Sequence, residues 1–314
     1  MTEESAQPGS TPPEFEGSWE RPDRSLTAAA FFGFLIIGVI YYYAQGFLAM
    51  ILVFSAGNIT PHGTTFIEQM TNSVAALKTP VRYSLVFSEF LFMLLPTFWL
   101  VTHWHTKKFF TYVRLRRVGY MDVLLAILAT VCFIPVSSFI ADYFLKQINF
   151  PDFLGRINEE LFTSYSGTEF ILLICVVCVT PAICEETLFR GYIQRTLERS
   201  LGIKSIFIVG ILFGLYHMEP LNLVSLSCLG IMIGFFYYRS KSLLPGMAAH
   251  FTNNALGITS MYKTPGGNPR IPFLSADVPT FMVIVGFAAT AGVLYIYWRR
   301  TAGNFASGPV STLG

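Results

Sequence analysis

Long apolar segments are the feature that most constrains the fold of this chain, and short polar or basic stretches separate them. A helix needs about 20 apolar residues to cross the hydrocarbon core of a bilayer, so the longer segments predict transmembrane helices. The segments cover residues 26–53, 81–104, 121–145, 168–200, 203–218, 221–238, 243–260 and 278–298. We therefore expect an all-α, polytopic transmembrane helix bundle with about eight spans.

The content of charged residues supports a membrane protein. Only 13% of the 314 residues are charged and 53% are apolar, whereas a soluble domain carries about 25% charged residues. The net charge of +2, without a long basic run, gives no sign of a nucleic-acid partner. All five cysteines lie in apolar segments, where we expect them to pack as small apolar groups.

Basic residues predict the orientation, because loops rich in lysine and arginine stay in the cytoplasm. With eight spans the clusters after the second, fourth, sixth and eighth segments fall on one side, together with both termini, which are therefore predicted to be cytoplasmic. We expect a disordered polar tail over residues 1–25, a transmembrane domain over 26–300 with its motif-bearing core at about 168–260, and a short cytoplasmic tail over 301–314.

Three charged residues stand together at the end of the apolar run before them: Glu185, Glu186 and Arg190. Ionisable groups inside a membrane are costly and therefore suggest a function. Glu186 and Arg190 are four residues apart on one helical face, which predicts an ion pair. Glu185 points about 100° away and lacks a local partner, so it is a candidate acid or base. The alternative is that both glutamates only tie the helix end to the loop. The other acidic pair, Glu159 and Glu160, is predicted to lie on a solvated helix face.

Two later apolar segments each carry one histidine. Phe213 and His217 are four residues apart on one face, and Gly214 would let a neighbouring helix approach closely. His250 and Asn254 have the same spacing and present two hydrogen-bond donors side by side, as an oxyanion site requires.

These residues are the parts needed to activate water for hydrolysis. Glu185 with His217 would deprotonate water, while His250 with Asn254 would stabilise a tetrahedral oxyanion. No serine or cysteine stands beside them as an evident nucleophile, so we expect direct attack by water without a cofactor. A zinc site formed by Glu185, His217 and His250 is the competing chemistry, although the sequence lacks the His-Glu-x-x-His motif.

The three motifs, in this order, resemble those of the CAAX-processing and bacteriocin-processing (CPBP) family. They are Glu-Glu-x-x-x-Arg from Glu185 to Arg190, Phe-x-x-x-His from Phe213 to His217, and His-x-x-x-Asn from His250 to Asn254. The resemblance covers about residues 170–256. It implies a glutamate-dependent, metal-independent intramembrane endopeptidase similar to type II CAAX prenyl endopeptidases. It also implies supporting roles for Glu186, Arg190 and Phe213.

The expected substrate is a membrane-associated, prenylated or otherwise lipidated protein or peptide. We expect a multi-pass protein of a prokaryotic plasma membrane, with its active site open to the cytoplasm. The alternative is a non-catalytic membrane scaffold, regulator or bacteriocin-immunity factor on the same fold. A proton-coupled transporter is disfavoured, because no inverted repeat is evident.

The predicted spans leave one difficulty. Glu185 would lie near the cytoplasmic end of its helix, and His217 near the far end of the next. The two can meet only if the first helix is long and tilted and the second is short. Pro181 could kink the first helix and open a water-filled cavity at Glu185.

Overall fold

The computed structural model describes residues 15–55, 66–147, 159–271 and 278–305. Within these ranges the chain is helical and its only β-structure is two isolated bridges. The helices are α1 (Leu26–Ser55), α2 (Phe66–Ser88), α3 (Leu95–Trp104), α4 (Phe109–Tyr112), α5 (Tyr120–Gln147), α7 (Gly167–Leu173), α8 (Thr180–Glu186), α9 (Arg195–Leu201), α10 (Lys204–Tyr216), α11 (Leu223–Ser240), α12 (Leu244–Ser260) and α13 (Thr280–Arg300). Three π-helical segments, η1 (Glu89–Leu94), η2 (Ile174–Val179) and η3 (Thr187–Gln194), continue these helices, and a 3-10 turn, η5 (Ala302–Phe305), follows α13.

Six helical stretches of the described chain are long and apolar enough to cross a membrane, which makes this an integral membrane protein. They are Leu26–Leu52, Leu77–Trp104, Tyr120–Gln147, Gly167–Leu201, Leu223–Ser240 and Thr280–Arg300. The other two predicted segments are helical but short, with 13 residues in α10 and 17 in α12. The all-helical fold is confirmed, while the count of about eight spans and the cytoplasmic termini stay predictions.

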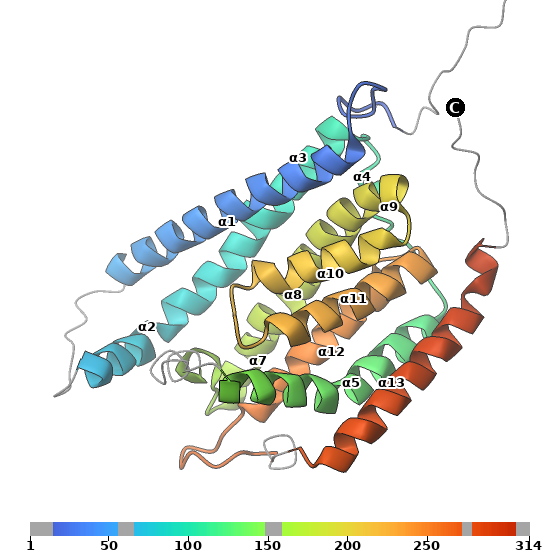
Figure 1. Ribbon diagram of the computed structural model, residues 1–314. Helices are drawn as coiled ribbons and strands as arrows, with labels where there is room; N and C mark the ends of the chain where they lie inside the picture. Colours follow the sequence, from blue (N-terminus) through green and yellow to red (C-terminus); the bar gives the residue numbers. More distant parts are fainter. Residues whose placement is uncertain (1–14, 56–65, 148–158, 272–277, 306–314) are drawn as a thin grey trace, which may run out of the picture.

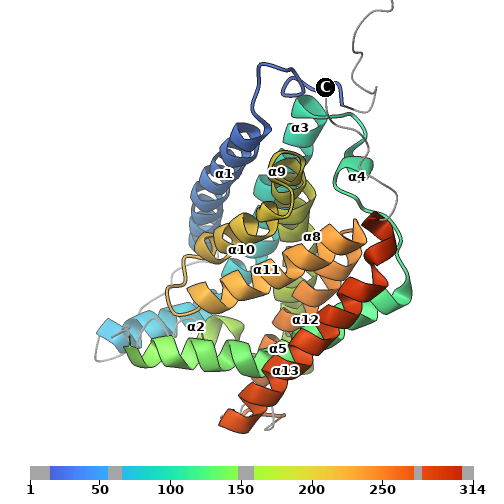
Figure 2. The ribbon, with the colours of Figure 1, turned by 45° about the vertical axis from the view of Figure 1, so that its right-hand side comes forward.

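The helix that carries Glu185 is long. From α7 to α9 the chain forms a continuous helical stretch, Gly167–Leu201, of 35 residues, which is about 50 Å at 1.5 Å per residue. Glu185 lies near the middle of this stretch. In contrast, α10 is only about 20 Å long by the same measure, and its turn into α11 lies midway along the bundle (Figures 1 and 2). A long helix beside a short one thus brings the expected site residues to the same depth.

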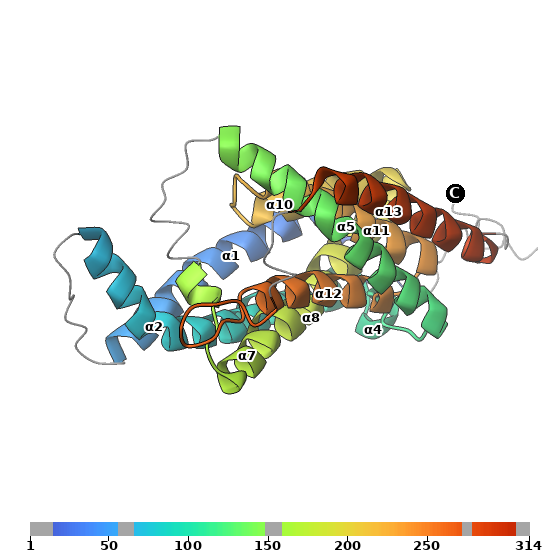
Figure 3. The ribbon, with the colours of Figure 1, turned by 90° about the horizontal axis from the view of Figure 1, so that it is seen from below.

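The bundle has two main apolar cores. The larger one joins α1, η1 and α3 to α8, η3, α9 and α10. The second joins α5, α11, α12 and α13. Seen from below, α1 and α2 lie on one side and the neighbouring α5 and α13 on the other (Figure 3). The long helix packs in the first core and α12 in the second. Contacts between these two helices therefore lie where the two cores meet.

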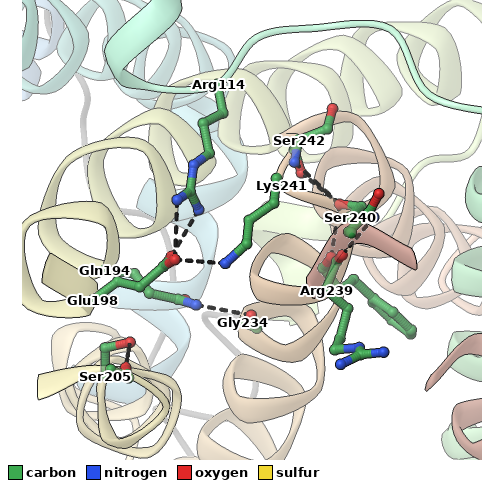
Figure 4. A network of polar contacts seen from close by, with 12 residues as sticks. Arg114, Gln194, Glu198, Ser205, Gly234, Arg239, Ser240, Lys241 and Ser242 are labelled. Atoms are coloured by element: carbon green, nitrogen blue, oxygen red, sulfur yellow. Dashed lines mark hydrogen bonds and ion pairs between the residues drawn. The ribbon is translucent and has the colours of Figure 1, made fainter. Parts of the chain in front are cut away.

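A polar network joins three segments at one end of the bundle (Figure 4). The Glu198 carboxylate of α9 accepts hydrogen bonds from both terminal nitrogens of Arg114, at 2.7 and 3.0 Å, and from Lys241 Nζ at 2.7 Å. Arg114 precedes α5, and Lys241 connects α11 to α12. We call this group the Glu198 network; it fastens the chain ends of three helices together.

Residues 15–25 correct one prediction, because the predicted disordered tail does not extend over them. Gly17 and Trp19 form backbone hydrogen bonds with the end of α3. Glu20 accepts two hydrogen bonds from Arg199 and lies 2.6 Å from His105 Nδ1. This segment is therefore packed against the bundle, while residues 1–14 of the predicted tail lie outside the described residues.

Candidate active site

Three titratable side chains from three helices meet inside the bundle. Glu185 belongs to α8, His217 directly follows α10, and His250 lies in α12. The Oε2 atom of Glu185 lies 3.8 Å from Nε2 of His217 and 3.9 Å from Nε2 of His250. The side chains of Glu185 and His250 are buried, whereas that of His217 is 24% exposed. The cluster is therefore enclosed, with its most open side at His217.

A backbone carbonyl fixes the ring of His217. Its Nδ1 lies 2.8 Å from the carbonyl oxygen of Phe213, and because a carbonyl can only accept, Nδ1 carries the hydrogen. In the neutral ring Nε2 is then an acceptor that faces the carboxylate of Glu185. Two acceptors cannot form a hydrogen bond with each other, but a water molecule can donate to both atoms of this pair, which lie 3.8 Å apart. The local fold thus prepares His217 to accept a proton.

A carboxylate holds the other histidine. The Oε1 atom of Glu186 lies 2.8 Å both from His250 Nδ1 and from Arg190 Nη1, and Arg190 also donates to the carbonyl of Gly230 on α11. The side chains of Glu186, Arg190 and His250 are all buried. The predicted Glu186–Arg190 ion pair is confirmed. The structure adds that Glu186 orients His250, so that the opposite nitrogen of its ring faces Glu185.

Asn254 lies one turn beyond His250 on α12. Its Nδ2 donates to the carbonyl of Val177 at 2.7 Å, and its Oδ1 accepts from Nδ2 of Asn253. Because an amide nitrogen carries two hydrogens, one of them remains for another acceptor. Asn253 thus helps to fix the side chain of its neighbour. Asn254 is thus held firmly, with one N–H left that could donate to an oxyanion.

Two glycines permit the close packing around the cluster. A Cβ atom at Gly214 would lie 2.7 Å from the carbonyl oxygen of Leu223, so the predicted close approach of a neighbouring helix is confirmed. A Cβ at Gly246 would lie 3.1 Å from Oε2 of Glu186. Larger side chains at these positions would push α11 or α12 away from the charged residues.

Comparison with known proteins agrees with this geometry. Residues 167–256 match the family model described as type II CAAX prenyl endopeptidase Rce1-like. Over this segment, the chain matches the CAAX-protease family. The matched residues include all the predicted site residues from Glu185 to Asn254. Neither the curated proteins nor the solved structures contain a match to the chain.

One buried carboxyl beside the CAAX-protease motifs escaped the sequence analysis. Glu89 begins η1, is 4% exposed, and its Oε2 atom has no hydrogen-bond partner. The η1 segment packs against α8, which carries Glu185. It is the one acidic residue between residues 81 and 104. The rule that drew attention to Glu185, that a charge inside a membrane needs an explanation, would have found it too.

The second acidic pair, Glu159 and Glu160, has its own basic partners outside this cluster. Glu159 pairs with Lys263, and Glu160 lies 3.8 Å from Lys78. The side chain of Glu159 is 54% exposed, as expected of a solvated helix face.

The side chains of the alternative zinc site lie farther apart than the ligands of one zinc ion. In the described part of the chain, no group of three or more histidine, cysteine, aspartate or glutamate side chains has an arrangement that could hold a metal ion. Glu185 Oε2 and the two Nε2 atoms lie 3.8 and 3.9 Å apart, wider than adjacent ligands of one zinc ion, which each lie about 2.0–2.2 Å from the metal. The zinc alternative would require these side chains to move closer together.

Proposed function

We propose that this CAAX-protease family member is an intramembrane endopeptidase that hydrolyses a peptide bond in a membrane-associated or lipidated protein. The observation that carries the proposal is the convergence of Glu185 Oε2 on both histidines, at 3.8 and 3.9 Å. A scaffold would have no use for a buried carboxylate that faces two imidazole nitrogens without a direct hydrogen bond to either.

In the proposed reaction Glu185 and His217 activate a water molecule. Both Oε2 and Nε2 can accept a hydrogen from one water, which turns its oxygen toward a peptide carbonyl held at the open side of the cluster. As the oxygen attacks the carbonyl carbon, a proton passes to this pair. The same proton then goes to the leaving amide nitrogen as the C–N bond breaks, so that a carboxylic acid and an amine are formed.

His250 and Asn254 are the proposed donors to the oxyanion. His250 already gives its Nδ1 hydrogen to Glu186, so it can donate from Nε2 only when the ring carries both protons. Asn254 would donate the hydrogen that Val177 does not use. Donors fixed in advance stabilise the developing charge without reorganisation, and removal of one such donor typically costs about 10²–10³ in rate.

We test the function with membranes from cells that express wild type, Glu185→Gln or Glu159→Gln at matched levels. New peptide termini would be surveyed by mass spectrometry. We expect cleavage products with wild type and with Glu159→Gln, since Glu159 pairs with Lys263 at the surface. For Glu185→Gln we expect a rate about 10²–10⁴-fold lower, the usual contribution of a general base. Identical termini in all three samples would reject the peptidase.

Further arms of this experiment address the substrate and the metal. Peptides with and without a prenyl group, offered to the purified protein in bilayers, distinguish a prenyl endopeptidase from a broader membrane peptidase. Cleavage that withstands a strong zinc chelator would support hydrolysis by Glu185 and His217 alone. Cleavage lost with the chelator and restored by zinc would instead favour the zinc site. A prokaryotic plasma membrane and a site open to the cytoplasm remain part of the proposal.

A further inference from the structure

One acidic residue close to the cluster has no part in the hydrolysis described above. Glu219 follows His217 by two residues and is the one acidic residue between Lys204 and Arg239. No lysine or arginine lies within this stretch, which forms the mostly apolar helices α10 and α11. An ionisable group among apolar membrane helices suggests a function by default, because it needs a partner or water. Glu219 therefore requires an explanation of its own.

Glu219 lies in the turn that joins α10 to α11, midway along the bundle (Figures 1 and 2). The side chain of Met218 is 69% exposed, and Glu219 and Pro220 are exposed as well. Non-helical backbone at membrane depth is tolerated only where it is buried in protein or lines a water-filled cavity. Because these three residues are not buried, the turn is expected to line such a cavity. His217, the most exposed member of the cluster, begins the same turn.

A neighbouring amide holds the carboxylate of Glu219. Its Oε2 accepts a hydrogen bond from Nδ2 of Asn222 at 2.8 Å, and the backbone N–H of Asn222 donates to the carbonyl oxygen of Glu219. Asn222 immediately precedes α11, where an asparagine side chain commonly accepts a hydrogen bond from the first helical turn. It forms no such bond here. The side chain of Asn222 therefore orients Glu219 and does not cap α11.

The described part of the chain gives Glu219 no positive partner. Its side chain accepts a hydrogen bond from the neutral amide of Asn222 and forms no ion pair with a lysine, arginine or histidine of the described residues. A carboxylate can accept about four hydrogen bonds, so Glu219 keeps places for donors from another molecule. An oriented, exposed carboxylate without a cation attracts a cationic group by charge complementarity.

The distance from His217 limits which part of a substrate could reach this carboxylate. Consecutive Cα atoms are 3.8 Å apart, so those of His217 and Glu219 are separated by at most about 7.6 Å. An extended peptide advances about 3.3 Å per residue. A substrate residue that contacts Glu219 therefore lies within about two positions of the bond that faces His217.

We propose that Glu219 is a specificity-determining residue: its carboxylate pairs with a lysine or arginine of the substrate within about two residues of the cleaved bond. This inference rests on the proposed function and names a class of substrate for it. The ion pair orients the peptide and takes no part in the transfer of protons. The competing interpretation is structural, because a negative charge before α11 also interacts favourably with the N-terminus of that helix.

The first test measures binding and does not require cleavage. Purified Glu185→Gln protein, in bilayers of neutral lipid, would be titrated with synthetic prenylated peptides that carry lysine, glutamine or glutamate at the residues flanking the anchor. The lysine peptide should bind about fivefold more tightly than the glutamine peptide, at the upper end of what exposed ion pairs contribute. Adding Glu219→Gln should abolish this difference, and adding Glu219→Lys should make the glutamate peptide the preferred one. Equal binding of all three peptides, or a preference that survives Glu219→Gln, would overturn the proposal.

The second test measures cleavage with Glu185 intact. Glu219→Gln keeps an acceptor for Asn222, so it should raise KM for the lysine peptide about fivefold while leaving kcat and the glutamine peptide unchanged. Glu159→Lys is the matched control, because Glu159 is an exposed carboxylate with its own partner, Lys263. It should keep the wild-type preference.

The outcomes distinguish this proposal from a structural role and from failure of the proposed function. If Glu219→Gln lowers the unfolding temperature and slows all peptides equally, Glu219 only supports α11 and the proposal is wrong. If Glu185→Gln cleaves as fast as wild type, the proposed function fails. The binding preference still decides whether Glu219 selects a cationic side chain.

Discussion

The long helix Gly167–Leu201 carries two groups of charged residues that differ in purpose. Near its middle, Glu186 binds Arg190 and His250, and all of these side chains are at most 2% exposed. Three turns later, Glu198 binds Arg114 and Lys241, whose side chains are 10–19% exposed. Both use one carboxylate to gather two donors. The inner group orients a histidine toward Glu185, while the Glu198 network only joins chain segments. Similar ion pairs therefore do not imply similar roles. The role depends on the additional partner of the carboxylate, which is His250 for Glu186 and Lys241 for Glu198.

Burial should make the inner group far more sensitive to substitution. We expect Arg190→Met to destabilise the protein by about 3–5 kcal/mol, because it leaves the carboxylate of Glu186 without its cation in a dry site. Thermal unfolding in detergent would measure the loss. The double variant Glu186→Gln/Arg190→Met should recover much of the stability but not the cleavage rate, since His250 no longer has a carboxylate to orient it. If activity returned together with stability, orientation by Glu186 would be refuted.

The Glu198 network provides the matched comparison. Glu198→Gln should cost about 1–2 kcal/mol, between the values for exposed and for buried pairs. It should leave kcat of the correctly folded protein unchanged, because Glu198 lies about 18 Å along the helix from Glu186 at 1.5 Å per residue. The measurement is again thermal unfolding, together with cleavage rates below the unfolding temperature. A large fall in kcat would show that the two groups are coupled.

The smallest effect on stability is expected for residues 15–25, whose packing against the bundle should weaken in acid. Burial alone would raise the pKa of Glu20, but hydrogen bonds from Arg199 and His105 outweigh it and lower that pKa to about 2 from 4.5. Burial also lowers the pKa of His105 below 6.5, despite the opposing contact with Glu20. Both pKa values are lower in the folded protein, so the stabilisation is present at higher pH and lost as the pH falls.

This loss should begin below pH 6.5, where free histidine gains a proton, and increase from about pH 4.5 toward 2 as Glu20 is protonated. The ring of Trp19 packs against that of Trp104, with ring centroids 5.2 Å apart, so its fluorescence should report release of the segment. A Trp19→Phe variant shows which part of the fluorescence change comes from Trp19. Fluorescence that stays constant between pH 7 and 4 would contradict this role of Glu20 and His105.

Local sequence spacing predicted the helices and one ion pair, because both depend on residues that are close together in the sequence. The apolar runs located the helices, and i, i+4 spacing located the Glu186–Arg190 pair. Spacing could not reveal that Glu186 also holds His250, since this contact joins residues 64 positions apart. Nor could it give the depth of His217, which depends on where α10 ends and on the length of its neighbour. The rule that a charge inside a membrane needs an explanation would have identified Glu89, but Glu89 belongs to none of the three motifs.

The length of the short helix α10 sets how deep His217 lies in the bundle. Its 13 residues reach about 20 Å into the bundle from the end where α9 turns into it. An extended peptide advances about 3.3 Å per residue, so a substrate entering along this path would need about six residues to arrive at His217. The length of one helix would thereby select peptides by the distance between their anchor and the bond to be cut.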